Sequence, residues 1–186
     1  RQFQGCSDIE LASKGVEQAE YLGKKLNGDF DYIYSSPLKR AKKTASIIAN
    51  GTGKKPLIVN DLHEINYGKW EGLTTKEILR NYKEEYKAWR TDDIEGPLCG
   101  GELSLKNACF RAKNAILSIV KEHRGKKIAM VAHGGIIKAG LTGLFDWKLT
   151  MYHKIMLLNT SVSKILFDDN LNPVILTIND TSHLLK

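Results

Sequence analysis

Short apolar runs alternate with amphipathic stretches along this chain, and this alternation constrains its fold more than any other feature. The runs have the length and β-rich composition of strands and lie at 32–34, 57–59, 128–132, 162–167 and 174–178. Around them, apolar residues recur at helical spacing and predict helices at 13–26, 37–49, 75–90, 105–123 and 136–144. Strands that alternate with helices predict an α/β fold with a mostly parallel sheet.

Local signals mark where several of these helices begin and how the strands are covered. We expect Ser13 and Ser104 to cap the helices that follow them, and Ser36 to act as a cap before a first-turn proline, Pro37. The runs at 57–59 and 128–132 contain no polar residue, which predicts strands buried on both faces of the sheet.

The length of 186 residues indicates one domain spanning 1–186, and the sequence contains no internal repeat, linker or low-complexity tract. The chain opens at Arg1 in a polar, turn-like segment without an initiator methionine or a first strand. We therefore expect it to be an N-terminally shortened fragment of the domain, with the first strand missing.

Charge and cysteine content narrow the class of partner and the compartment. The net charge of +7 favours anionic ligands, with a solvated basic surface as the alternative. No aromatic stacking surface or recognition motif supports nucleic-acid binding. Three cysteines without C-x-x-C spacing argue against a disulfide framework and a zinc site, which favours the cytoplasm. No apolar run is long enough for a membrane span, and no signal-peptide pattern opens the chain.

Ligands of open α/β sheets bind beyond the carboxyl ends of the strands, and this rule picks out three exits, at 35–40, 61–68 and 133–135. His133 follows the run at 128–132, and Gly134 and Gly135 after it would let an anion approach the backbone closely. Arg40 lies in the first turn of the helix predicted from Pro37, where its guanidinium could bind two phosphate oxygens. The alternatives are a histidine that only ends a strand and an arginine on a basic surface.

Two further candidates are weak when taken singly. Glu64 lies in a loop rich in glycine and aromatic residues, and a loop carboxylate is usually just solvated. Gln4 and Gly5 together offer an amide and a backbone N–H that could donate to an anion.

None of these segments is specific alone, but their combination in this order is characteristic of one protein superfamily. The chain resembles the histidine phosphatase superfamily, which contains the cofactor-dependent phosphoglycerate mutases, and the resemblance covers essentially all 186 residues. It rests on Phe3-Gln4-Gly5, Ser35-Ser36-Pro37-Leu38-Lys39-Arg40-Ala41, the segment from Glu64 to Gly72, Gly100-Gly101-Glu102, Val131-Ala132-His133-Gly134-Gly135, and Asn179-Asp180-Thr181-Ser182-His183-Leu184. The resemblance implies a three-layer α-β-α sandwich of the phosphoglycerate mutase type.

The resemblance also implies a mechanism and a role for each site residue. Family members transfer a phosphoryl group to a histidine and then to water, without a metal ion or other cofactor. Arg40 and His133 would hold the phosphoryl oxygens, and Glu64 would protonate the leaving alcohol. Gln4, Gly5, Gly134 and Gly135 would line the phosphate pocket.

The family's nucleophilic histidine belongs to an Arg-His-Gly motif on the first strand, and this sequence contains no such triplet. None of the five histidines replaces it, so we expect the chain as given to be inactive and the nucleophile to lie upstream. A second departure is Gln2, at a position where the family often has arginine.

The resulting prediction is a metal-independent phosphomonoesterase that acts on small phosphorylated metabolites through a phosphohistidine. A cofactor-dependent phosphoglycerate mutase is one alternative, although the stretch between Glu64 and His133 leaves little sequence for a mutase lid. A non-catalytic binder of phosphorylated ligands is another.

Overall fold

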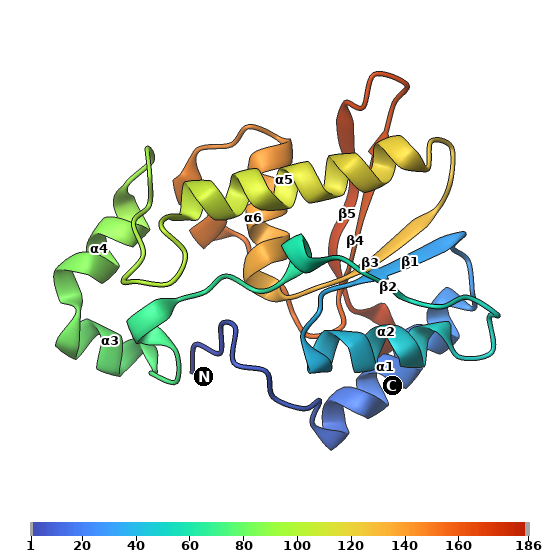
Figure 1. The fold of residues 1–186 in the computed structure, drawn as a ribbon, viewed down its shortest axis with the longest axis horizontal. Coiled ribbons are helices and arrows are strands. Elements are labelled where there is room, and N and C mark those ends of the chain that lie inside the picture. The colour runs from blue at the N-terminus through green and yellow to red at the C-terminus, as the bar shows by residue number, and fades with distance from the viewer. Residues whose placement is uncertain (1, 185–186) are drawn as a thin grey trace. The chain divides into compact units, whose positions relative to one another are not determined.

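The computed structural model describes residues 2–184, and the chain divides into two compact units (Figure 1). The first unit comprises Arg1–Ser7, Glu64–Asn114 and Gly135–Ile155. The second comprises Asp8–His63, Ala115–Gly134 and Met156–Lys186. In the described part of the chain, no helix is both long and apolar enough to cross a bilayer.

The second unit contains a three-stranded parallel sheet with the order β2-β1-β3. Its strands are β1 (Tyr32–Ser35), β2 (Leu57–Ile58) and β3 (Ile128–Val131). Tyr32 pairs with Ile128 and Tyr34 with Leu57, so the carboxyl ends of all three strands point the same way. The predicted α/β class with a parallel sheet is confirmed.

The side chains of β1 and β3 alternate between two apolar layers, as the two-residue period of a strand requires. On one face, Ile33 and Val131 pack against α1 (Ser13–Leu26) and α2 (Lys39–Ala49). On the other face, Tyr34 packs with Ala115 and Ile119 of α5 (Leu105–Glu122). Helices therefore cover both faces of this sheet, which is the predicted three-layer arrangement (Figure 1).

Two strands are less buried than the sequence predicts. Leu57 and Ile58 are each about half exposed, at 48% and 49%, because β2 is a short edge strand. Residues 128–131 are only partly buried, and within residues 2–184 no strand pairs with the outer edge of β3. The all-apolar runs therefore predicted the position of both strands correctly, but the prediction that both strands are buried on both faces was wrong.

The last two strands do not extend the parallel sheet. The strands β4 (Val162–Phe167) and β5 (Pro173–Asp180) form a separate antiparallel pair. Leu158 N donates to Asn179 Oδ1 at 2.7 Å, and Lys25 Nζ of α1 donates to Asp180 and Ser182. Residues 179–182, which belong to the family match, are thus held by hydrogen bonds within the second unit.

The predicted helix starts are only partly correct. Ser104 Oγ accepts from Asn107 N at 3.2 Å and caps α5, as expected. Ser13 is instead the first residue of α1 and caps nothing, and α2 begins at Lys39 rather than at Pro37. The carboxylate of Asp8 caps α2 by accepting from Lys39 N at 2.7 Å, so this cap comes from a distant segment.

The first unit is mainly helical and is built around buried aromatic side chains. It contains α3 (Thr75–Asn81), α4 (Lys83–Thr91), the first part of α5, and α6 (Gly134–Leu144) from Gly135 onward. The helix predicted over 75–90 is broken at Tyr82, whose φ of −141° is not helical. Trp70 is fully buried and lies edge-on against Phe3 and Trp89, which makes it a packing residue.

Candidate active site

The exits of β1 and β3 bring two of the predicted site residues together in the second unit. Ser36 N donates to Val131 O at 2.9 Å and extends the pairing just past the strand ends. Arg40 then lies in the first turn of α2, and His133 follows β3 by two residues. The Arg40 Nε donates to the Nδ1 of His133 at 3.2 Å, so the guanidinium and the imidazole are in direct contact.

His133 is buried, and its other ring nitrogen contacts Ser36, a residue that the sequence predicts as a helix cap. The Nε2 of His133 lies 2.7 Å from Oγ of Ser36, which has no solvent exposure. Burial lowers the pKa of His133 to about 3, and the positive charge of Arg40 and the ring of His63 act in the same direction. The imidazole is therefore neutral in this structure at physiological pH.

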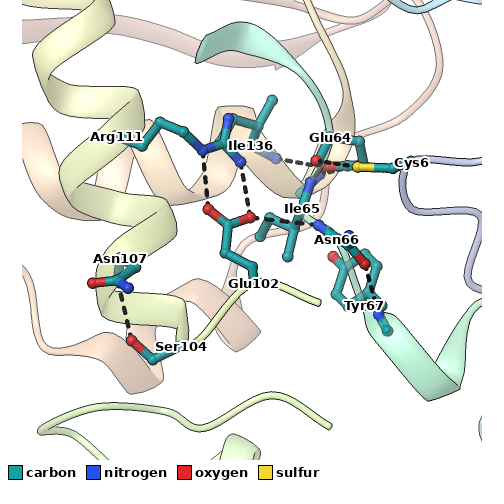
Figure 2. A network of polar contacts seen from close by, with 12 residues as sticks. Cys6, Glu64, Ile65, Asn66, Tyr67, Glu102, Ser104, Asn107, Arg111 and Ile136 are labelled. Atoms are coloured by element: carbon teal, nitrogen blue, oxygen red, sulfur yellow. Dashed lines mark hydrogen bonds and ion pairs between the residues drawn. The ribbon is translucent and has the colours of Figure 1, made fainter. Parts of the chain in front are cut away.

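Glu64 lies in the first unit, where its carboxylate accepts three backbone N–H groups. Figure 2 shows Glu64 beside Ile65 and Ile136, which provide two of the three donors. The donors are Ile65 at 2.8 Å, Gly135 at 2.9 Å and Ile136 at 2.8 Å. Gly135 and Ile136 belong to the first turn of α6, whose N–H groups have no partner within the helix. Glu64 is thus a buried carboxylate held at a helix N-terminus, although a carboxylate in a loop is usually solvated.

The two glycines after His133 occupy different environments. Gly134 belongs to the second unit and is exposed, with open space where a side chain would be. Gly135 belongs to the first unit and is buried, and a Cβ there would collide with Glu64 and with the hydroxyl of Tyr67. Gly135 therefore has no room for a larger side chain, and its N–H donates to Glu64. Contacts of either glycine with phosphate stay predictions.

The segment containing Gln4 and Gly5 is organised by a carboxylate that the sequence analysis did not identify, that of Glu71. Glu71 accepts from Cys6 N at 2.8 Å and from Tyr67 N at 3.2 Å. Gly5 has a φ of +52° and lies so close to Glu71 that a Cβ would clash with that carboxylate. Gln4 is exposed, and its predicted contact with phosphate stays a prediction.

Cys6 joins this turn to Glu64 within the first unit (Figure 2). Its Sγ donates to the backbone carbonyl of Glu64 at 3.2 Å. Burial, followed by the charge of Glu71, raises the pKa of the thiol to about 11, so the sulfur keeps the proton that this contact requires. Within the described residues, the three cysteines form no disulfide with one another.

The Gly100-Gly101-Glu102 match contributes a structural ion pair. Both oxygens of Glu102 accept from the guanidinium of Arg111 on α5, at 2.9 and 2.8 Å, and both side chains are largely buried (Figure 2). Glu102 also accepts from Asn66 N at 3.4 Å, which attaches it to the segment that follows Glu64. The pair holds the loop before α5 in place.

Three of the other histidines have structural partners. His123 stacks on Tyr32 and contacts the hydroxyl of Tyr34, His153 contacts the carbonyl of Trp89, and His183 contacts Thr160. In residues 2–184, no group of three or more His, Cys, Asp or Glu side chains could hold a metal ion.

Comparisons with known proteins give the family. The model of the histidine phosphatase superfamily (branch 1) matches residues 1–181, and so spans both units. The phosphoglycerate mutase-like protein 4 of Arabidopsis thaliana is 34% identical over 99% of this chain and 80% of its own. The phosphoserine phosphatase 1 of Hydrogenobacter thermophilus is 31% identical over 98% of this chain and 86% of its own.

Solved structures agree with the sequence comparisons. A mutant phosphoserine phosphatase from Entamoeba histolytica, in complex with phosphoserine, superposes with a TM-score of 0.92 and 36% identity, covering 99% of this chain and 91% of that one. The same enzyme in complex with 3-phosphoglyceric acid also gives a TM-score of 0.92, at 35% identity, with the same coverage of both chains. This chain therefore belongs to branch 1 of the histidine phosphatase superfamily.

Proposed function

We propose that this chain serves in a metal-independent phosphomonoesterase whose nucleophilic histidine lies outside residues 1–186, and that both units work as one domain over these residues. The observation that carries the proposal is the contact between Arg40 Nε and His133 Nδ1 at the strand exits. A guanidinium beside a buried neutral imidazole suits an anion with several oxygens, and the net charge of +7 suits an anionic substrate.

Arg40 and His133 would act on the phosphoryl group itself. During phosphoryl transfer negative charge is spread over the equatorial oxygens, so fixed donors lower the barrier more than covalent chemistry by the protein does. Arg40 supplies the cationic donor, and its contact with His133 limits the orientations of the guanidinium before substrate binds. Gly134 would add a backbone N–H from the first turn of α6.

Glu64 would carry the proton in both halves of the reaction. In the first half, the bond between phosphorus and the ester oxygen breaks, a phosphorus–nitrogen bond forms, and the leaving alcohol takes a proton from the Glu64 carboxyl. In the second half, water attacks the phosphohistidine, Glu64 accepts the proton of that water, and inorganic phosphate is released with free histidine. A positioned carboxyl of this kind typically contributes about 10²–10⁴-fold.

The nucleophile would be the histidine of the Arg-His-Gly motif that the family resemblance implies, because residues 1–186 contain no such triplet. The test compares this chain with an extended protein, in which a first strand carrying that motif precedes residue 1. We expect turnover of p-nitrophenyl phosphate by the extended protein and none by the 186-residue chain. Robust turnover by the short chain would exclude the upstream nucleophile, and an inactive extended protein would exclude the phosphatase.

The substrate we propose is a small phosphate ester that also carries a carboxylate. Phosphoserine and 3-phosphoglyceric acid, which appear in the names of similar proteins, share these two groups. A screen of phosphorylated metabolites with the extended protein tests this, with phosphate release as the readout. Equal rates for esters with and without a carboxylate would contradict it.

A phosphoglycerate mutase is the second candidate, because one similar protein is named as mutase-like. As for the compartment, three cysteines without a disulfide among the described residues suit a reducing environment, and we propose the cytoplasm.

A further inference from the structure

Both ring nitrogens of His133 have protein partners, and these partners assign the proton on the neutral ring. The Arg40 Nε can only donate, so the Nδ1 of His133 must be an acceptor without a proton. The proton of the neutral imidazole is then on Nε2, which donates to Ser36 Oγ at 2.7 Å. This tautomer presents a lone pair, and no proton, on the side of Arg40.

The proposed function requires the opposite tautomer once an anion is bound. Nε2 faces Ser36, which is completely buried, so Nδ1 is the nitrogen on the side of the proposed phosphoryl ligand Arg40. An unprotonated phosphoryl oxygen only accepts, so Nδ1 must carry a proton to contact such an oxygen. Because burial and Arg40 disfavour the doubly protonated ring, the neutral ring would have to move its proton from Nε2 to Nδ1.

Ser36 is suited to support both tautomers. A hydroxyl accepts from an N–H or donates to a nitrogen lone pair, depending only on how its O–H bond is rotated. The backbone of Ser36 is held in place, since Ser36 N donates to Val131 O at 2.9 Å. Leu38 N also donates to Ser36 Oγ at 3.3 Å, which leaves the serine proton available for Nε2.

We propose that Ser36 is a positioning residue that sets the tautomer of His133 according to the occupancy of the site; this inference rests on the proposed function. Without ligand, Nε2 keeps its proton and donates a hydrogen bond to Ser36 Oγ. With a phosphoryl anion bound, Nε2 loses one proton to solvent, Nδ1 gains one from solvent, and Ser36 donates to the bare Nε2. The net charge of the ring does not change, and the new Nδ1–H donates to the phosphoryl oxygen.

The direct test is nitrogen NMR of the 186-residue chain with ¹⁵N-labelled histidine, recorded without and with saturating inorganic phosphate. We expect the signals of His133 to report Nε2–H in the free chain and Nδ1–H in the phosphate complex. Phosphate bound with the Nε2–H tautomer unchanged, or with a doubly protonated ring, would overturn the inference and leave the proposed function standing. No phosphate binding at all would overturn both.

Variants at two neighbouring serines separate positioning from folding. Ser36→Ala should bind phosphate about 5- to 10-fold more weakly, as expected for the loss of one hydrogen bond, and should lose the tautomer change. Ser36→Thr keeps a hydroxyl and should restore the tautomer change. Ser35→Ala is the matched control, because Ser35 is equally buried but its hydroxyl bonds to the Ser36 carbonyl and not to His133.

The Ser35→Ala control decides how weaker phosphate binding by Ser36→Ala is interpreted. Wild-type affinity and tautomers in Ser35→Ala, together with similar urea unfolding midpoints of both alanine variants, would support the inference. Equal loss of phosphate affinity in both variants would mean that the serines act only by packing. Wild-type affinity in Ser36→Ala would likewise overturn the positioning role.

Discussion

Replacing Glu64 with glutamine tests a structural and a chemical role of the same carboxylate. The side chain keeps its length, but an amide has one oxygen that accepts and one nitrogen that only donates. If the amide oxygen takes the place of Oε1, it keeps the bonds from Ile65 and Ile136, and the NH₂ group then faces the N–H of Gly135. The opposite orientation loses two bonds instead of one.

The magnitude follows from that geometry. One hydrogen bond to a charged acceptor is lost, a buried donor is left unpaired, and the attraction of the carboxylate for the α6 N-terminus disappears. We expect the free energy of unfolding to fall by about 2–3 kcal/mol. Urea unfolding of the 186-residue chain at pH 7 measures this difference. An unchanged midpoint would refute the assigned contacts of Glu64.

The chemical role is measured in the extended protein. Glu64→Gln should lower turnover by about 10²–10⁴-fold. The loss should be larger for an alkyl phosphate than for p-nitrophenyl phosphate, because the nitrophenolate leaves without needing a proton. Glu71→Gln is the matched control, since Glu71 also accepts two backbone N–H groups of the first unit. Its effect on turnover should not depend on the leaving group, and equal small losses on both substrates in Glu64→Gln would contradict the acid role.

Four further outcomes are expected. Arg40→Lys should lower turnover by about 10²–10³-fold with little change in KM, because an ammonium cannot replace the guanidinium; near wild-type turnover would make Arg40 a surface residue. As the pH falls from 7 to 4, the buried neutral His133, with its pKa of about 3, should remove roughly 3 kcal/mol of stability, since the unfolded imidazole binds its proton near pH 6.5. Urea unfolding measured between pH 7 and pH 4 should show a smaller loss of stability for His133→Asn than for the unmodified chain. An equal loss in both proteins would contradict the low pKa assigned to His133. EDTA should leave the activity of the extended protein unchanged while vanadate inhibits it, and rescue by a divalent cation after EDTA would overturn the mechanism. Given 3-phosphoglycerate with catalytic 2,3-bisphosphoglycerate, the extended protein should release phosphate, whereas rapid formation of 2-phosphoglycerate would favour the mutase.

Local patterns in the sequence were sufficient for the fold class and for much of the secondary structure. The period-two alternation in Tyr32-Ile33-Tyr34 and the helical spacing around it depend on neighbours within a few residues, so they can be recognised without coordinates. The rule that ligands bind at strand exits also placed Arg40 and His133 in the same region, and the two side chains are in contact.

Tertiary structure alone decided the contacts between segments that lie far apart in the chain. Ser36 was expected to cap a helix, yet its hydroxyl contacts His133, and the cap of α2 comes from Asp8. Glu64 was weak evidence as a loop carboxylate, and only folding brings it to the N-terminus of α6. The exposure of β2 and the separate pairing of β4 with β5 depend in the same way on which strands become neighbours. Short motifs were therefore enough to identify the family and to propose the residues of the site. Hydrogen-bond partners and burial depend on chain segments tens of residues apart, and only the folded structure specifies them.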